Sequence, residues 1–141
     1  MNISEIEAGI VAEFDAFDDW MEKYNYIIES GKSLVPFDPK FREDRYLIKG
    51  CQSQVWLRAS MQENKVIYLA DSDALITKGI ASLLVRVLSN QTPDEIINAE
   101  LRFIDATGLK EHLSQTRSNG LMNMINQMKL YARAFKAKQQ I

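Results

Sequence analysis

The sequence predicts an α+β protein whose small antiparallel sheet of three strands is covered by helices. Three observations lead to this prediction. Apolar residues recur at helical spacing near both ends of the chain. Between these regions, three short segments are rich in β-branched and aromatic residues and are separated by polar, turn-like residues. Because the strand-like segments follow one another without intervening helices, an antiparallel sheet is expected.

Two helices are expected before the sheet. Ser4 followed by Glu7 is a capping-box pattern for the first helix, in which each residue satisfies a free backbone N–H of the first turn. The second helical pattern begins near Asp18 or Asp19 and stops at Gly31, which is predicted to be a helix-ending glycine. Both helices carry a row of apolar side chains, as helices that cover a sheet do.

The three strand candidates follow a loop that is marked by Pro36 and Pro39. Each proline removes a backbone donor and restricts the residue before it, which disfavours regular structure there. The candidates are "RYLIKG" at 45–50, "SQVWLRASM" at 53–61 and "KVIYLAD" at 65–71. Only a few polar residues separate the last two, so these segments predict a hairpin.

Helices are expected for most of the remaining chain. The short polar residues at 71–73 precede the apolar run 74–88 and predict a helix N-terminus. This helix is expected to be central because the run is apolar on nearly all sides. Gly79 within it indicates close packing, since glycine costs a helix about 1 kcal/mol relative to alanine. The residues "TPDE" at 92–95 predict a further helix start, and the last helix is expected to begin near Ser118.

Length and composition fit a single cytoplasmic domain spanning residues 1–141. The net charge of −2 argues against nucleic acid as the main partner, because phosphate binding draws on a surplus of basic residues. No apolar run reaches the roughly 20 residues of a membrane span, and the acidic N-terminus does not match a secretory signal. One cysteine cannot form an internal disulfide, which agrees with a reducing cytoplasm.

The one cysteine of the chain, Cys51, lies between Gly50 and the polar residues Gln52, Ser53 and Gln54. Free cysteines are most often buried and inert, so a purely structural thiol is the plain alternative. Here Gly50 can adopt backbone angles that are closed to other residues, and none of the polar residues that follow favours a core. We therefore expect the thiol in a turn between two strands, where a rigid sheet displays reactive groups.

The sequence lacks the partner residues that several kinds of cysteine chemistry require, which limits the reactions that Cys51 can carry out. There is no second cysteine to resolve a disulfide, so self-contained oxidoreductase chemistry is disfavoured. One cysteine and one histidine, His112, cannot by themselves hold a structural zinc ion or an iron–sulfur cluster, so no metal site is expected. A conventional nucleophile paired with His112 lacks the usual sequence context. A solitary thiol fits the transfer of a group from one protein to another.

Four motifs occur in order from about Asn25 to the last helix: "GCQSQVW", "ADSDALITKG", "TPDEI" and "HLSQTRSNGL". Together they resemble the SufE family of sulfur-acceptor proteins. Gln115 stands where a proline is common in that family, and the loop with Pro36 and Pro39 is of a variable kind. Neither departure touches the thiol. The resemblance implies an α+β fold similar to that of the IscU scaffold proteins.

The resemblance also implies a sulfur-transfer function. Proteins of this family take sulfane sulfur from the persulfide of a PLP-dependent, SufS-like cysteine desulfurase. They carry it on the cysteine that matches Cys51, stimulate the desulfurase, and pass the sulfur to an iron–sulfur scaffold such as a SufBCD-like complex. The PLP belongs to the desulfurase, so this chain is expected to bind no cofactor, and a homodimer is left open. Asp73 and Arg117 match positions linked to placing the cysteine loop or engaging the desulfurase, and Gly50 and Gln52 are expected to act in the loop itself.

Other interpretations of these residues remain open. The chain could activate a desulfurase allosterically, with Cys51 incidental, or Cys51 could be a conventional nucleophile that pairs with His112. Asp71 is expected to cap a helix, and the same role competes with loop placement for Asp73. If the carrier function is right, we expect Cys51 to rest against apolar side chains and to move out when the partner docks.

Overall fold

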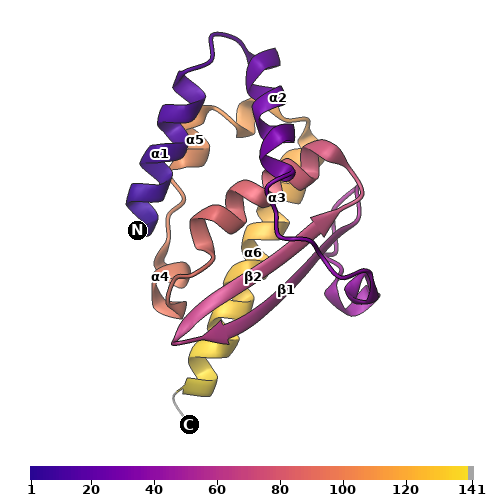
Figure 1. Ribbon diagram of the computed structural model, residues 1–141, viewed down its shortest axis with the longest axis vertical. Helices are drawn as coiled ribbons and strands as arrows, with labels where there is room; N and C mark the ends of the chain where they lie inside the picture. Colours follow the sequence, from indigo (N-terminus) through magenta and orange to yellow (C-terminus); the bar gives the residue numbers. More distant parts are fainter. Residues whose placement is uncertain (140–141) are drawn as a thin grey trace.

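The computed structural model describes residues 1–139 and has mixed helix and sheet (Figure 1). Its helices are α1 (Ile3–Asp15), α2 (Trp20–Gly31), α3 (Leu75–Leu88), α4 (Pro93–Asn98), α5 (Phe103–Thr107) and α6 (Gln115–Gln139). Its strands are β1 (Val55–Gln62) and β2 (Lys65–Ser72), and short 3-10 turns occur at Pro39–Phe41, Asp44–Tyr46 and Lys110–His112. The α+β class predicted from the sequence is confirmed. Within residues 1–139, no helix is both long enough and apolar enough to cross a membrane.

The two strands form the antiparallel hairpin that was expected from the sequence. Val55 lies opposite Ser72 at the open end, and Gln62 lies opposite Lys65 at the turn. The turn residues Glu63 and Asn64 both have positive φ, at 51° and 66°. Two residues of this conformation match the right-handed twist of the strands, which explains why the hairpin closes over so short a connection.

The predicted third strand, at 45–50, is not formed, so the sheet in the described chain has two strands rather than three. This segment begins as a 3-10 turn and then makes a single antiparallel bridge, between Leu47 and Trp56. The Ile48 N–H donates to the Val55 carbonyl at 2.8 Å. Gly50, with φ of +85°, then turns the chain away before a ladder can develop. The β-like composition was real, but the glycine limits the pairing to one bridge.

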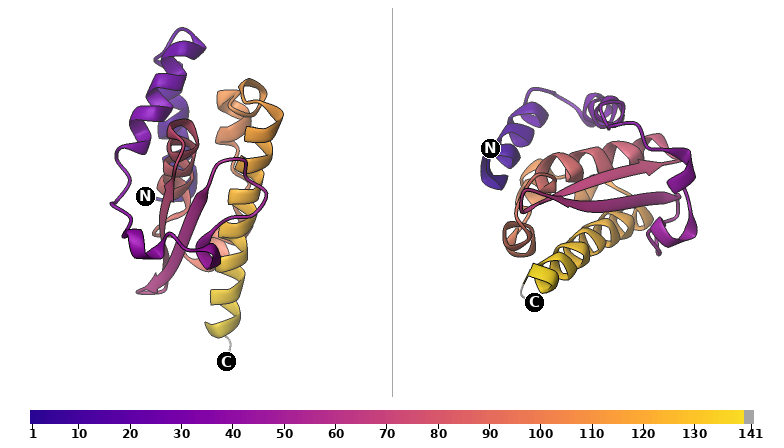
Figure 2. Two further views of the ribbon diagram at one scale, coloured as in Figure 1. Left: turned by 90° about the vertical axis from the view of Figure 1, so that its right-hand side faces the viewer. Right: turned by 60° about the horizontal axis from the view of Figure 1, so that its bottom comes forward.

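Helix α3 is the centre of the molecule, as its apolar sequence predicted. It packs against α2, β2, α1 and α6, and most of its residues are buried. Figure 2 shows α6 running along the hairpin on the side away from α1 and α2. The hydrophobic core lies between these layers and includes Ile10, Phe14, Ile27, Leu57, Tyr68, Ile80, Leu84, Leu121, Met124 and Met128.

Close packing at Gly79 is also confirmed. A Cβ added there would overlap the backbone carbonyl of Ile27 on α2. The facing residue is Gly31, where an added Cβ would lie 3.0 Å from the Gly79 nitrogen. Gly31 is therefore the last residue of α2 and a contact point between helices, instead of the left-handed residue after a helix end that the sequence suggested.

Several helix boundaries differ from the sequence predictions. The capping box of α1 uses Asn2 and Glu5 instead of Ser4 and Glu7, so the same chemistry is shifted by two residues. The second helix begins as expected, with Asp19 accepting from the Glu22 N–H. The predicted cap at Thr92 is also present, with Pro93 in the first turn. Helix α6 begins at Gln115, earlier than the predicted Ser118.

Candidate functional site

Cys51 lies in a loop, residues 49–54, that leads into β1 and is called the cysteine loop below. The Ile48–Val55 hydrogen bond closes its base. At Gly50 the backbone takes φ of +85°, and the Gly50 carbonyl accepts from the Asn123 side chain of α6 at 3.0 Å. A Cβ at Gly50 would lie 2.5 Å from the Asn123 nitrogen. Gly50 is therefore needed both for its backbone angles and for its contact with α6.

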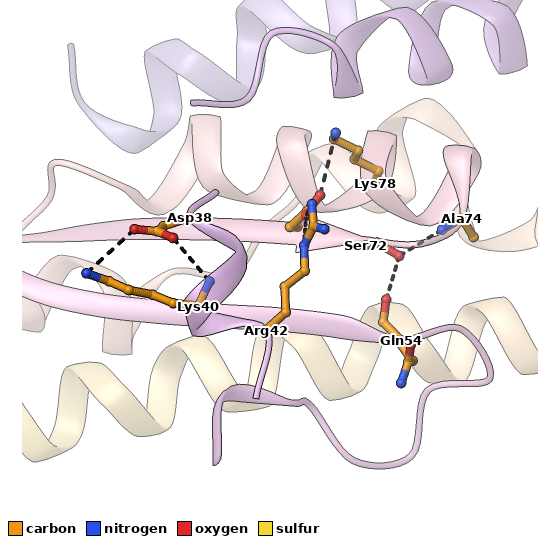
Figure 3. A network of polar contacts seen from close by, with 8 residues as sticks. Asp38, Lys40, Arg42, Gln54, Ser72, Ala74 and Lys78 are labelled. Atoms are coloured by element: carbon orange, nitrogen blue, oxygen red, sulfur yellow. Dashed lines mark hydrogen bonds and ion pairs between the residues drawn. The ribbon is translucent and has the colours of Figure 1, made fainter. Parts of the chain in front are cut away.

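The other end of the cysteine loop is attached to the junction between β2 and α3. The Gln54 N–H donates to Asp73 Oδ1 at 3.0 Å. The Gln54 carbonyl accepts from the Ser72 hydroxyl at 2.7 Å, as Figure 3 shows. The N-cap position of α3 is Ala74, and no side chain caps this helix. The capping role considered for Asp71 and Asp73 is therefore wrong, because Asp73 bonds the loop and Asp71 is buried elsewhere.

The thiol of Cys51 is half-buried against α6. Its sulfur lies 3.8 Å from the Gly120 carbonyl oxygen, and a Cβ at Gly120 would be in van der Waals contact with the sulfur. A pocket of about 60 Å³ opens beside it. Loop, α3 and α6 contribute its other lining residues, which are Gln52, Ser53, Thr77, Ile80, Thr116, Arg117, Gly120 and Met124. The sulfur thus rests beside a pocket whose lining includes both apolar and polar side chains.

The candidate residues do not all meet at the thiol. Arg117 and Gln52 line the pocket beside Cys51, and the Arg117 backbone N–H donates to the Ser114 hydroxyl at 3.2 Å. Asp73 is exposed and does not line the pocket. Among the described residues it forms no ion pair with Arg117. The structure therefore places Arg117 at the edge of the pocket that Cys51 lines, and Asp73 at the end of the loop.

A buried carboxylate near the loop was not anticipated from the sequence. Asp71 is 3% exposed, and its Oδ2 accepts from Arg42 Nε at 2.9 Å and pairs with Nη2 at 2.6 Å. Lys78 of α3 approaches Oδ1 at 3.5 Å, and the guanidinium also lies over the Trp56 ring. Figure 3 shows Arg42 reaching across the hairpin to this site, with Lys78 on the far side. These contacts hold the segment before the cysteine loop against the sheet.

His112 does not belong to the pocket. Its ring stacks on Trp20 at 3.9 Å between centroids, and its Nδ1 lies 2.9 Å from the Gly108 carbonyl oxygen. The Tyr24 hydroxyl donates to the His112 carbonyl. The imidazole therefore packs against α2 instead of pairing with Cys51, which removes the geometric basis for a Cys51–His112 nucleophile. Within residues 1–139, no cluster of three or more acidic, histidine or cysteine side chains could hold a metal ion.

Fold and site together define a small α+β protein that holds one half-buried cysteine thiol on a loop between α6 and the junction of β2 with α3. Comparison with known proteins agrees with this class. Residues 8–132 match the family model described as SufE, an Fe-S metabolism associated domain. The chain therefore belongs to the SufE family, and the family recognised from the sequence motifs is confirmed.

Two relatives and one solved structure illustrate the similarity. SufE-like protein 1, chloroplastic/mitochondrial, of Arabidopsis thaliana is 41% identical over 84% of this chain, which spans 32% of that protein. A SufE-like protein of Synechocystis sp. is 36% identical over 94% of this chain and 83% of its own length. The solution structure of a hypothetical protein from Thermus thermophilus matches with a TM-score of 0.75 at 18% identity, covering 92% of this chain and 94% of that one. This last likeness supports the fold.

The burial of Cys51 predicts that its thiol reacts slowly with alkylating reagents in the resting protein. Removal of water from the sulfur raises the pKa of Cys51 above the ordinary value of a cysteine. Because only the thiolate is nucleophilic, the rate of iodoacetamide alkylation should reach its midpoint at a higher pH in the native protein than in the chain unfolded in urea. The native state also holds this proton more tightly, so its stability should fall as the pH rises above the unfolded-state pKa. A native midpoint at or below the unfolded one would show that the thiol is activated at rest.

Replacement of Gly50 with alanine should destabilise the protein by about 1–3 kcal/mol, because an L-residue is strained at this φ and the new methyl meets Asn123. Gly108→Ala is the matched control. Gly108 has φ of +72°, but its added Cβ would lie 3.6 Å from the nearest atom, so only the backbone strain applies. Urea unfolding measures both variants. Equal losses would mean that the Asn123 contact adds nothing at Gly50.

Proposed function

We propose that this chain accepts sulfane sulfur from a PLP-dependent cysteine desulfurase onto Cys51, stimulates that enzyme, and passes the sulfur to an iron–sulfur assembly scaffold. The PLP and the nascent cluster belong to the partners, of SufS-like and SufBCD-like type. Membership of a family associated with Fe-S metabolism supports the proposal. A reducing compartment such as the cytoplasm suits a protein whose one cysteine must stay free.

The observation that carries the proposal is the position of Cys51. The sulfur lies on a short loop with anchors at both ends, at Gly50 and at Gln54, and none of the described contacts holds the side chain of Gln52. A carrier needs a thiol that a partner can reach but that solvent oxidants reach less easily. Half-burial in a small pocket meets both needs when docking moves the loop outward. Asp73, Gln52 and Arg117 are proposed to place the loop or to meet the desulfurase.

The transfer follows the chemistry of thiol–disulfide exchange. The Cys51 thiolate attacks the terminal sulfur of the desulfurase persulfide, a new sulfur–sulfur bond forms at Cys51, and the old bond breaks. The desulfurase cysteine leaves as a thiolate and takes up the proton that Cys51 gave up. Electrons balance within the exchange, so the step needs no oxidant or reductant. Delivery to the scaffold repeats the exchange with Cys51 as the leaving group.

Intact mass spectrometry tests the first step. After incubation with a cysteine desulfurase and cysteine, the chain should gain the mass of one sulfur atom, and the gain should disappear on reduction. A Cys51→Ser chain treated in the same way is the control and should gain nothing. A wild-type chain that stays unmodified while the desulfurase itself carries a persulfide would overturn the carrier function.

The half-burial of the thiol also favours a second function, in which the chain activates the desulfurase by binding alone. In that case Cys51 would be incidental, and the surface around Asp73 and Arg117 would carry the whole effect. The two functions predict different desulfurase stimulation by a Cys51→Ser chain, which lacks the sulfur but keeps the surrounding surface.

A further inference from the structure

The pocket beside Cys51 has room for one more atom of sulfur. Its volume is about 60 Å³, whereas a cavity needs only about 10–15 Å³ of this kind of space to hold a water molecule. A sulfur atom is only slightly larger than a water molecule. The pocket is therefore large enough for the terminal sulfur of a Cys51 persulfide, and Ile80 and Met124 are apolar residues of its lining.

Thr77 is the unusual polar residue of this pocket. It is 8% exposed, yet its hydroxyl makes no hydrogen bond with any other described residue. The other buried hydroxyl residues all donate to a carbonyl: Tyr68 to Met128, Ser82 to Gly79, Thr107 to Phe103 and Ser118 to Lys110. Every fully enclosed side-chain oxygen or nitrogen in residues 1–139 has a partner, so the Thr77 oxygen keeps some accessible surface, and Thr77 is one of the residues that line the pocket. Because the described chain offers this hydroxyl no acceptor, its hydrogen is available to a group that enters the pocket.

The electrostatic surroundings of the pocket favour an anion. Thr77 lies in the first turn of α3, and Thr116 and Arg117 lie in the first turn of α6. These two helix starts and the cysteine loop meet at the same end of the molecule (Figure 1). The N-terminus of a helix carries partial positive charge. Arg117 is the one charged side chain among the residues that line the pocket, so no carboxylate there opposes an anion.

We infer that the Thr77 hydroxyl donates a hydrogen bond to the terminal sulfur of a persulfide on Cys51 and so stabilises its anionic form in the pocket. This inference rests on the proposed function for the origin of the persulfide. A persulfide is a stronger acid than a thiol, and an anionic sulfur accepts hydrogen bonds far better than a neutral one. The pocket would therefore favour the loaded over the unloaded state. Burial, which raises the pKa of the free thiol, keeps the unloaded sulfur neutral.

The test loads Cys51 chemically, without a desulfurase. An aromatic disulfide reagent first converts the thiol into a mixed disulfide. Hydrosulfide then attacks the Cys51 sulfur and displaces the aromatic thiolate, which leaves one added sulfur on the protein. The persulfide pKa is measured from its ultraviolet absorbance across pH in wild type, Thr77→Val, Thr77→Ala and Thr77→Ser. Valine keeps the shape of threonine but replaces the hydroxyl with a methyl group. Alanine removes both the hydroxyl and the methyl group, and serine keeps the hydroxyl alone.

Both variants without a hydroxyl should raise the persulfide pKa by about one unit, a tenfold weaker preference for the anion. Thr77→Ser should stay within about 0.3 units of wild type, since the donor is retained. Equal pKa values in wild type and the valine and alanine variants would overturn the inference, as would a serine variant that shifts as far as valine. Because no desulfurase is used, this result is separate from the proposed function. A desulfurase that fails to load wild type would refute that function alone.

Discussion

Replacement of Cys51 with serine is expected to abolish sulfur acceptance and to reduce desulfurase stimulation to the level of the desulfurase alone. Serine differs from cysteine by one atom, so the cysteine loop and the surface around Asp73 and Arg117 should be retained. The hydroxyl cannot take up sulfane sulfur, because its oxygen is a much poorer nucleophile than a thiolate and forms no stable bond of this type. Sulfide release from cysteine, measured with and without an added reductant, records the effect.

The control for this experiment is binding. Cys51→Ser should bind the desulfurase as wild type does, which isothermal titration can establish, so that loss of stimulation is not loss of docking. Full stimulation by the serine variant without reductant would contradict the carrier function and support the allosteric one. Partial stimulation that depends on a reductant would show that docking and transfer both contribute.

The largest effect on stability is expected from Gly79→Ala. The added methyl would overlap the backbone of Ile27, where α2 and α3 meet, and backbone cannot move aside as a side chain can. Overpacking of this kind costs roughly 1–3 kcal/mol, occasionally more, against a gain of about 1 kcal/mol in helix propensity. Because the overlap is with a backbone oxygen, the cost should lie at or above the upper end of this range. We therefore expect a net loss of about 2 kcal/mol or more in the free energy of unfolding, measured with urea, with an unchanged m-value.

Gly9→Ala is the matched control for this variant. Gly9 also lies within a helix, α1, but its added Cβ would sit 3.8 Å from Arg86 Nη2, which is ordinary contact. Only the propensity term applies there, so this variant should be as stable as wild type or more stable by up to about 1 kcal/mol. If Gly79→Ala and Gly9→Ala had the same free energy of unfolding, α2 and α3 would be farther apart at Gly79 than the structure shows.

The sequence predicted the parts of the fold that depend on local chemistry. Apolar residues on nearly all sides of α3 indicated a central helix, and Gly79 indicated close packing there, although not that α2 is the partner. The residues at 92–95 form the capping box that their spacing implied. Each of these features is decided by residues within one or two turns of the chain, so periodicity and capping rules are enough to find them.

Some errors were local, and others occurred where distant residues decide the structure. The segment 45–50 has strand-like composition, but its pairing ends at Gly50. Asp71 looked like a helix cap because of its sequence neighbours, whereas its partner Arg42 lies 29 residues away. No local pattern pairs these two residues. No local pattern would have singled out Thr77 either, because its hydroxyl is notable only for lacking a hydrogen-bond partner among the described residues.

Cys51 was predicted in a turn between two strands; it does lie in a loop that leads into β1, but the strand expected before it is not formed. The surroundings of the thiol were not predicted. The family motif singled out the thiol and Arg117, and both line the same pocket. The contacts of the loop with Asn123 and Gly120 depend on how α6 lies against the hairpin. That arrangement arises from packing across the whole molecule, so the sequence could indicate a reactive sulfur without showing how it is held.

The most direct test of the carrier function is the second transfer. The chain is loaded with radiolabelled sulfur, separated from the desulfurase, and mixed with an iron–sulfur scaffold complex that lacks sulfur. The label should leave Cys51 and appear on the scaffold with no desulfurase present. Label that stays on Cys51, or that reaches the scaffold only when the desulfurase is added back, would contradict the claim that this cysteine carries sulfur between the two proteins.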